Sequence, residues 1–161
     1  MVPRLGSLIA AALLSVLIAA PVSAATPFEL SGHFKESFGR PANAELCDLQ
    51  PPFCGAGMVR GLGKATTLFY LDGTKTITLE SDGSTLVMQE TLVLFETPGA
   101  STDAPGALVS FGNPYRLVVT WEADPNLSTG IFAGATGLGT TSVVAGGDAI
   151  IVTTKGTLTL Q

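Results

Sequence analysis

One carboxylate interrupts an apolar face of an alternating segment, residues 84–95. Alternation of this kind is typical of a strand, and it places Glu90 on one face with four apolar side chains: Leu86, Met88, Leu92 and Leu94. If that face points into a barrel, burial raises the pKa of the Glu90 carboxyl. A carboxyl group with a raised pKa can act as a general acid or polarise a bound ligand. Glu90 is therefore the first candidate for a ligand-binding residue.

Two other arrangements would remove that role from Glu90. The strand can face the other way, with Val87, Val93 and Phe95 inside, or Glu90 can form an ion pair with Arg116 or Lys64. Trp121 is the second candidate ligand-binding residue. It lies in a further alternating segment, residues 115–123, where an indole ring either fills the core or stacks on a ligand.

Other residue types that perform chemistry are scarce. His33 is the only histidine, and alternation places it opposite Phe28, Leu30 and Phe34, so we expect it at the surface and outside any Ser-His-Asp triad. Residues 55–64, GAGMVRGLGK, lack the first glycine of the phosphate-loop pattern and the Ser or Thr after its lysine. No catalytic residue can be assigned, and we expect no metal site and no cofactor.

Two cysteines, Cys47 and Cys54, are separated by a short segment that contains Pro51-Pro52. Close cysteines in an oxidising compartment are expected to form a disulfide. The alternative is a pair of free buried thiols. Because the loop is short, the bridge would fix a local loop and would not hold the fold together.

The first 24 residues have the pattern of a secretory signal peptide. Arg4 precedes an uncharged apolar stretch, residues 5–20, and Val22-Ser23-Ala24 supplies the small residues read by a signal peptidase. We expect cleavage after Ala24 and a secreted or periplasmic protein. An uncleaved membrane anchor is the alternative, although the apolar stretch is shorter than the ~20 residues that span a bilayer.

Residues 25–161 are enough for one domain with its own core. The chain has 8 basic and 13 acidic residues, a formal net charge of −5. A negative protein is repelled by nucleic acid and by anionic lipid, so we expect no nucleic-acid partner, and no membrane partner after cleavage of the signal peptide. The oligomeric state is not predicted.

The remaining pattern is that of short strands separated by turns. Asp72-Gly73 and Asp82-Gly83 separate alternating segments, which predicts two β-hairpins in a meander. Residues 36–57 are expected to form a long loop. The Gly- and Thr-rich run 128–160 suits strands that bend tightly and pack closely. The expected strands before that run cover residues 28–35, 60–71, 74–80, 84–95 and 115–123. We therefore expect an all-β fold, a single antiparallel closed barrel of about eight strands, with a sandwich as the alternative.

Three segments resemble one family: residues 61–66 (GLGKAT), 129–140 (TGIFAGATGLGT) and 156–160 (GTLTL). They are similar to motifs of secreted bacterial proteins with an allene oxide cyclase-like, or dirigent-like, β-barrel domain. The best-known proteins with this barrel are plant cyclases and dirigent proteins, which act on apolar, reactive intermediates. None of the plant enzymes' catalytic residues matches a position in this chain, so the resemblance implies a fold and not a reaction.

Three functions are compatible with an exported barrel of this kind. The first is binding of an apolar small molecule in the barrel or at its mouth. The second is a cyclase, isomerase or dirigent-like enzyme that confines a reactive apolar intermediate. The third is a structural or surface-association protein with a filled core. Several polar groups beside one apolar cavity would favour the enzyme, purely apolar lining would favour binding, and a packed interior would favour the structural role.

Overall fold

The structure, a computed structural model, describes residues 25–38, 53–96, 115–146 and 149–161. These residues form eight strands and one short 3₁₀ helix. In chain order the elements are β1 Thr26–Phe38, β2 Phe53–Val59, β3 Gly63–Phe69, β4 Thr74–Leu79, β5 Thr85–Glu96, β6 Tyr115–Ala123, η1 Gly130–Phe132, β7 Thr136–Gly146 and β8 Ala149–Leu160. No helix in this described part of the chain is long and apolar enough to cross a membrane.

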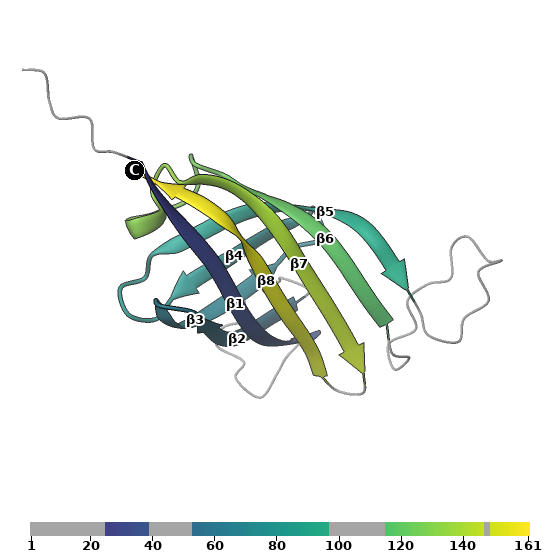
Figure 1. Cartoon of the computed structure of the whole chain (residues 1–161). Coiled ribbons are helices and arrows are strands. Elements are labelled where there is room, and N and C mark those ends of the chain that lie inside the picture. Colours follow the sequence, from purple (N-terminus) through teal and green to yellow (C-terminus); the bar gives the residue numbers. More distant parts are fainter. Residues whose placement is uncertain (1–24, 39–52, 97–114, 147–148) are drawn as a thin grey trace, which may run out of the picture.

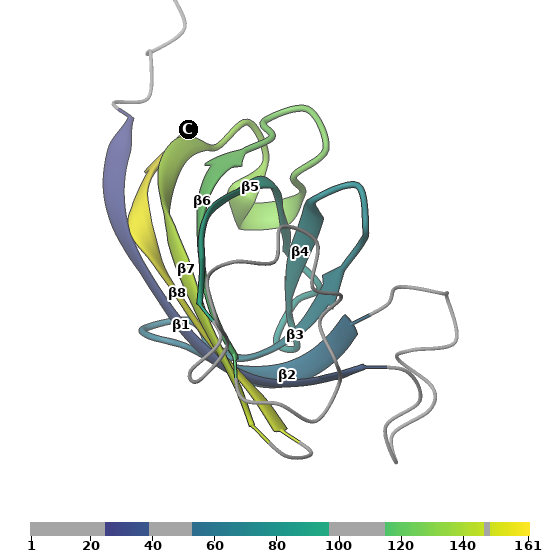
Figure 2. The same cartoon turned by 90° about the vertical axis from the view of Figure 1, so that its right-hand side faces the viewer.

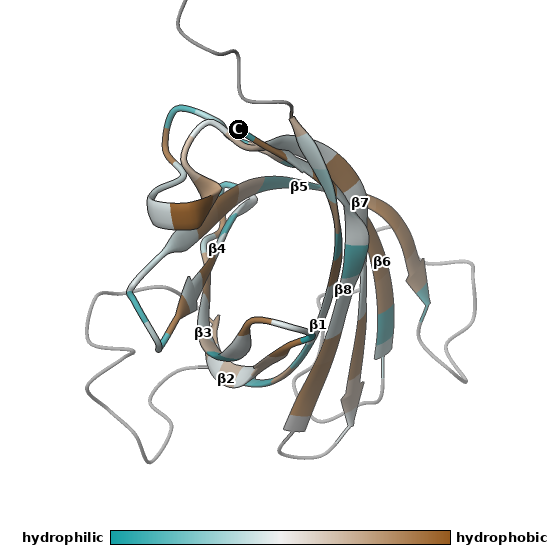
Figure 3. Ribbon diagram, turned by 60° about the vertical axis from the view of Figure 1, so that its left-hand side comes forward, coloured by the Kyte–Doolittle hydropathy of each residue, from teal (hydrophilic) through white to brown (hydrophobic). Residues whose placement is uncertain are grey.

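The strands close into one antiparallel barrel. Each strand pairs with the next, and β8 pairs with β1 along most of its length (Figure 1, Figure 2). In Figure 3 the strands form a complete ring. Closure gives each described strand a partner on both sides, although β5 beyond Gln89 pairs only with β6. The predicted all-β barrel of about eight strands is confirmed.

Both Asp-Gly pairs lie at the tips of hairpins, as predicted. Gly73 has φ 87° and Gly83 has φ 74°, values that favour glycine because a Cβ would be strained there. The backbone amide of Thr74 donates a hydrogen bond to Asp72 Oδ1 at 2.8 Å. These turns connect β3 to β4 and β4 to β5, so the predicted meander is confirmed.

The expected long loop over residues 36–57 is wrong at both ends. β1 continues to Phe38, and β2 begins at Phe53. The sequence pattern of β2 is weak because Gly55 and Gly57 occupy inward positions where apolar side chains would mark a strand. A Cβ at Gly57 would collide with the carbonyl oxygen of His33, so glycine lets β1 and β2 approach closely.

One end of the barrel is filled by apolar side chains. Helix η1 lies at the end where the C-terminus lies (Figure 1), and its Phe132 is fully buried in the same core cluster as Leu86 and Leu158. The segment between β6 and β7 that contains η1 is held in place by hydrogen bonds, including one from the amide of Ile131 to Ser84 Oγ at 3.0 Å. Any opening to the interior must therefore lie at the opposite end of the barrel.

Trp121 spans the middle of the barrel over two glycines. It pairs with Gly139 on β7, and Gly139 pairs with Gly156 on β8. The indole ring of Trp121, 2% exposed, occupies the space that a Cβ on either glycine would need. These glycines are therefore required by packing, which agrees with the expectation that the Gly-rich run packs closely. Burial of a tryptophan side chain contributes about 4–6 kcal/mol.

We predict that Gly156→Ala lowers the free energy of unfolding by about 1–3 kcal/mol, because the added methyl group collides with the Trp121 ring and with the Leu138 carbonyl oxygen. Gly146→Ala is the matched control, since no atom lies within 4 Å of its added Cβ. Urea denaturation of both variants measures the difference. Equal stability of the two variants would contradict this packing.

Candidate functional site

Three charged side chains of the described residues point into the barrel. Glu36 on β1 follows the inward positions of Leu30 and Phe34, and Lys75 on β4 shares its face with the buried Ile77 and Leu79. Glu90 on β5 is the third. Charged groups are rarely placed inside a protein unless they are paired or have a function. This cluster is the candidate site.

Glu36 and Lys75 form a buried ion pair. Lys75 Nζ lies 2.7 Å from Glu36 Oε1, and the two side chains are 2% and 5% exposed. The hydroxyl of Thr67 on β3 donates a second hydrogen bond to the same oxygen, at 2.8 Å. These contacts join β1, β3 and β4 across the interior, and they neutralise both charges.

A glycine on β2 makes this contact possible. Glu36 pairs with Gly55, and Gly55 pairs with Thr67, so the Glu36 side chain must cross β2 to reach Thr67. A Cβ at Gly55 would lie 2.7 Å from Glu36 Cγ. The missing side chain therefore leaves the path along which Glu36 reaches β3 and β4.

Glu90 faces the interior. This is one of the two strand orientations that the sequence allowed. It pairs with Trp121 on the neighbouring strand, and its Oε1 is buried with no hydrogen-bond partner among the described residues. Burial raises the pKa of the Glu90 carboxyl above its ordinary value of 4.5, and the Glu36 carboxylate raises this pKa further. The Lys75 ammonium and the Thr141 hydroxyl lower it, but burial has the largest effect.

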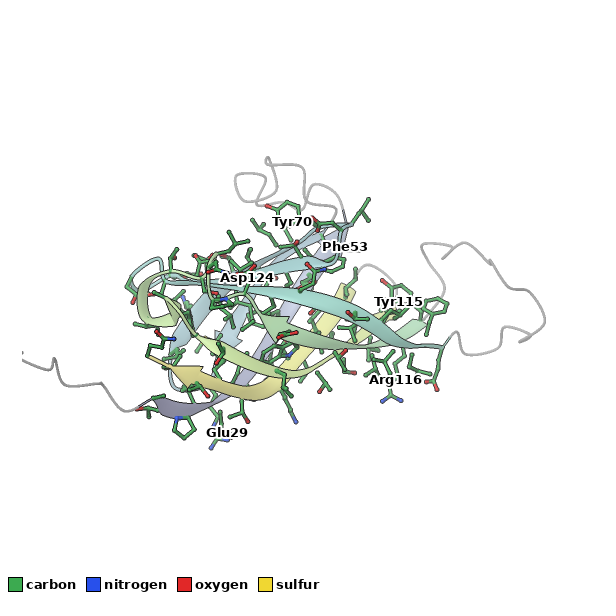
Figure 4. The ribbon with its side chains drawn as sticks, turned by 90° about the horizontal axis from the view of Figure 1, so that it is seen from above. Glu29, Phe53, Tyr70, Tyr115, Arg116 and Asp124 are labelled. Carbon is green, nitrogen blue, oxygen red and sulfur yellow. The ribbon has the colours of Figure 1, made fainter. Side chains whose placement is uncertain are left out.

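A cavity of about 60 Å³, partly open to solvent, lies beside these groups. Its wall is mostly apolar but includes the three charged side chains; the lining residues are Glu36, Phe53, Phe69, Lys75, Glu90, Tyr115, Leu117, Val119, Val143 and Ile150. In Figure 4 Phe53 and Tyr115 lie toward the right-hand end of the barrel, and Glu29 and Asp124 lie toward the left. The cavity is thus at the end opposite η1.

The predicted apolar face around Glu90 is only half correct. Leu86 and Met88 are fully buried, but Leu92 is 59% and Leu94 is 39% exposed. The pairing of β5 with β6 shifts between Leu92 and Leu94, a β-bulge that reverses which face later side chains occupy. The bulge turns Leu94 to the outer face, but Leu92 lies before it. Because β5 pairs with β4 only as far as Gln89, Leu92 lies on a part of β5 that pairs with β6 alone, which leaves its side chain exposed (Figure 1).

The cation that acts on Glu90, at a distance and without a direct contact, is neither Arg116 nor Lys64 but Lys75. Arg116 instead contacts Glu96 at 3.6 Å, at the surface, and Lys64 is exposed. The alternation of Lys75 with the apolar Ile77 and Leu79 was the sequence pattern that indicated an inward-facing lysine. Glu36 was assigned to a loop, although it continues the alternation of β1.

The other predicted site residues have separate outcomes. His33 is exposed, as expected, and its Nδ1 lies 3.2 Å from Thr153 Oγ1. Trp121 is buried in the core but is not among the described residues that line the cavity, so its contact with a ligand stays a prediction. No group of three or more potential metal ligands occurs in the described ranges.

Cys54 lies on β2 and is buried. The described residues contain no free cysteine. Cys47 lies outside the described residues, so its bridge to Cys54 also stays a prediction.

We predict that Lys75→Met lowers the free energy of unfolding by about 3–5 kcal/mol, because it leaves the Glu36 carboxylate buried without a cation. Adding Glu36→Gln to this variant should recover much of the loss. Arg116→Met, at the exposed ion pair with Glu96, should cost less than about 1 kcal/mol. Urea denaturation tests the series, and a double variant no more stable than Lys75→Met alone would contradict the role of the pair.

We predict that the stability of Glu90→Gln relative to the wild type increases as pH rises from 4.5. The folded protein holds the Glu90 proton to higher pH than the unfolded chain does, so wild-type stability falls between the ordinary pKa of 4.5 and the raised one. The glutamine variant lacks this loss. Denaturation from pH 4 to 8 checks it, with exposed Thr91→Ala as a control that does not titrate. A difference that shrinks with rising pH would show that the pKa is lowered.

No family model, curated protein or solved structure matches the chain. The resemblance to barrels of the allene oxide cyclase-like or dirigent-like kind therefore stays a prediction, and the function is inferred from the chemistry of the cavity.

Proposed function

We propose that the protein binds a small, mostly apolar molecule in the cavity at the open end of the barrel, with one polar group directed at Glu90. The observation that carries this proposal is the buried Glu90 Oε1, which has no hydrogen-bond partner among the described residues and belongs to a side chain that lines an apolar cavity. An unsatisfied buried polar atom is costly, and a ligand that donates a hydrogen bond to it removes that cost.

The size of the cavity restricts the ligand. A volume of about 60 Å³ holds several water-sized groups, so it accepts a polar group with a few carbon atoms. A longer ligand would extend over the aromatic side chains of Phe53, Phe69 and Tyr115 toward solvent. Burial of about 100 Å² of apolar ligand surface contributes about 2.5 kcal/mol before the entropy of association is subtracted. By itself this apolar contact corresponds to a dissociation constant no tighter than about 15 mM, so the polar contact with Glu90 must supply any further affinity.

A second candidate function is catalysis of a proton transfer, as in a cyclase or isomerase. One specific observation favours it: a carboxyl group with a raised pKa, Glu90, lines the same apolar cavity as Lys75 and Tyr115. Such a carboxyl group can give or take a proton at a bound apolar intermediate. Several polar groups beside one apolar cavity are the expected sign of an enzyme. Binding is nevertheless proposed first, because Lys75 and Glu36 pair with each other, which leaves Glu90 as the one charged lining group with an unpartnered oxygen among the described residues.

The structural role receives less support. Its expected sign is an interior fully packed with side chains, whereas the cavity beside Glu90 leaves part of the interior open. A buried carboxyl oxygen that has no hydrogen-bond partner among the described residues adds nothing to the stability of a purely structural core.

The proposed setting is outside the cytoplasm, in the secreted or periplasmic fraction. Its support is the signal-peptide pattern of residues 1–24, which lie outside the described residues.

We predict that small n-butyl or benzyl compounds with a polar end group bind in the cavity and shift the amide NMR signals of the residues that line it. Val143→Phe should abolish the shifts by filling the cavity, because Val143 faces inward and lines it. Val144→Phe is the matched control, since the next side chain on β7 is 52% exposed and faces outward. Shifts scattered over the surface, or unchanged by Val143→Phe, would contradict the site.

A further inference from the structure

We propose that the polar group received by this cavity is an ammonium, so that the ligand is a small apolar amine. This inference rests on the function proposed above and adds the class of ligand. It stands on the arrangement of Glu36, Lys75 and Glu90 around the cavity.

The charges of the cluster do not balance. Two carboxylates, Glu36 and Glu90, line the cavity with one ammonium, Lys75. The Lys75 ammonium is already paired with the Glu36 carboxylate, with Nζ 2.7 Å from Oε1. When Glu90 is ionised, the uncompensated charge beside the cavity is therefore negative, and the group that would neutralise it is a cation.

The hydrogen bonds of the cluster lead to the same ligand. Glu36 Oε1 already accepts bonds from Lys75 and Thr67. Glu90 Oε1 accepts none from the described residues. An ammonium carries three donors and is a strong partner for a carboxylate. A ligand carboxylate would instead meet two like charges, with Lys75 already paired.

No other described group that lines the cavity replaces the missing cation. Tyr115 on β6 also faces it, and burial together with the Glu36 carboxylate raises the pKa of its phenol, which keeps this group neutral. Thr141 on β7 contributes a neutral hydroxyl to Glu90. The lining residue from β8 is the apolar Ile150. The remaining wall is aliphatic or aromatic, which suits an alkyl or aryl substituent on the amine.

Binding of an ammonium must also displace the proton that burial holds on Glu90. An adjacent positive charge favours the ionised carboxylate, so it lowers the pKa that burial has raised. The affinity for an amine should therefore increase as pH rises from 4.5 through the pKa of Glu90 in the free protein, and then level off. Neutral alcohols should show no such increase, because they do not require the ionised form.

The test compares n-butylamine, n-butanol and n-butyrate by NMR titration of the purified protein in 0.15 M NaCl. We expect the amine to bind at least tenfold more tightly than the other two at pH 8, and less tightly at pH 5. Glu90→Gln should remove the preference for the amine. Glu122→Gln, which removes an exposed carboxylate from β6, should leave it unchanged. The pH dependence in the wild type tests the proposal even if Glu90→Gln does not fold.

Each outcome decides between the two proposals. If the alcohol binds in the cavity as tightly as the amine, or if the affinity for the amine is the same from pH 5 to pH 8, the amine inference is overturned and the proposed function stands. Tightest binding of butyrate overturns the inference as well, and it would mean that Lys75 exchanges Glu36 for the ligand. If none of the three compounds binds in the cavity, the proposed function fails together with the inference.

Discussion

The interior of this barrel is organised by the ion pair between Lys75 and Glu36. Two charges separated by 2.7 Å, each on a side chain that is at most 5% exposed, are stable because they neutralise each other and because the Thr67 hydroxyl donates a further hydrogen bond to the Glu36 carboxylate. The pair lines the cavity, and on β4 the buried Ile77 and Leu79 continue from Lys75 into the packed core. It also sets the potential at Glu90, whose carboxyl group lies among the same charges without a direct partner for one oxygen.

Missing side chains are as important as the charged ones. Gly55 lets Glu36 cross β2, and Gly139 with Gly156 lets the Trp121 ring lie across β7 and β8. Both arrangements bring residues from three or more strands into contact. These strand glycines thus have a physical reason, because a small barrel can hold large or charged side chains only where the residues next to them are small.

Several of these features could be predicted from the sequence, because they depend on local patterns. Strict alternation in residues 115–123 gave β6 its correct bounds, and the glycines after Asp72 and Asp82 gave two hairpins. Features set by contacts between distant strands could not be predicted. Glu36 and Lys75 are 39 residues apart, and nothing local indicates that they meet. The bulge after Leu92 and the end of the β4–β5 pairing at Gln89 likewise have no local signature, so the apolar face around Glu90 was extended too far.

The central claim is that the Glu90 carboxyl group lies in the cavity with a raised pKa and an oxygen left for a ligand. Its most direct test is an NMR titration of the side-chain carboxyl carbon of Glu90, assigned with Glu90→Gln. The account predicts one titration with a midpoint above 4.5 that moves to lower pH when a small amine is added. A midpoint at or below 4.5 in the free protein would contradict it, because the carboxylate would then be solvated or paired.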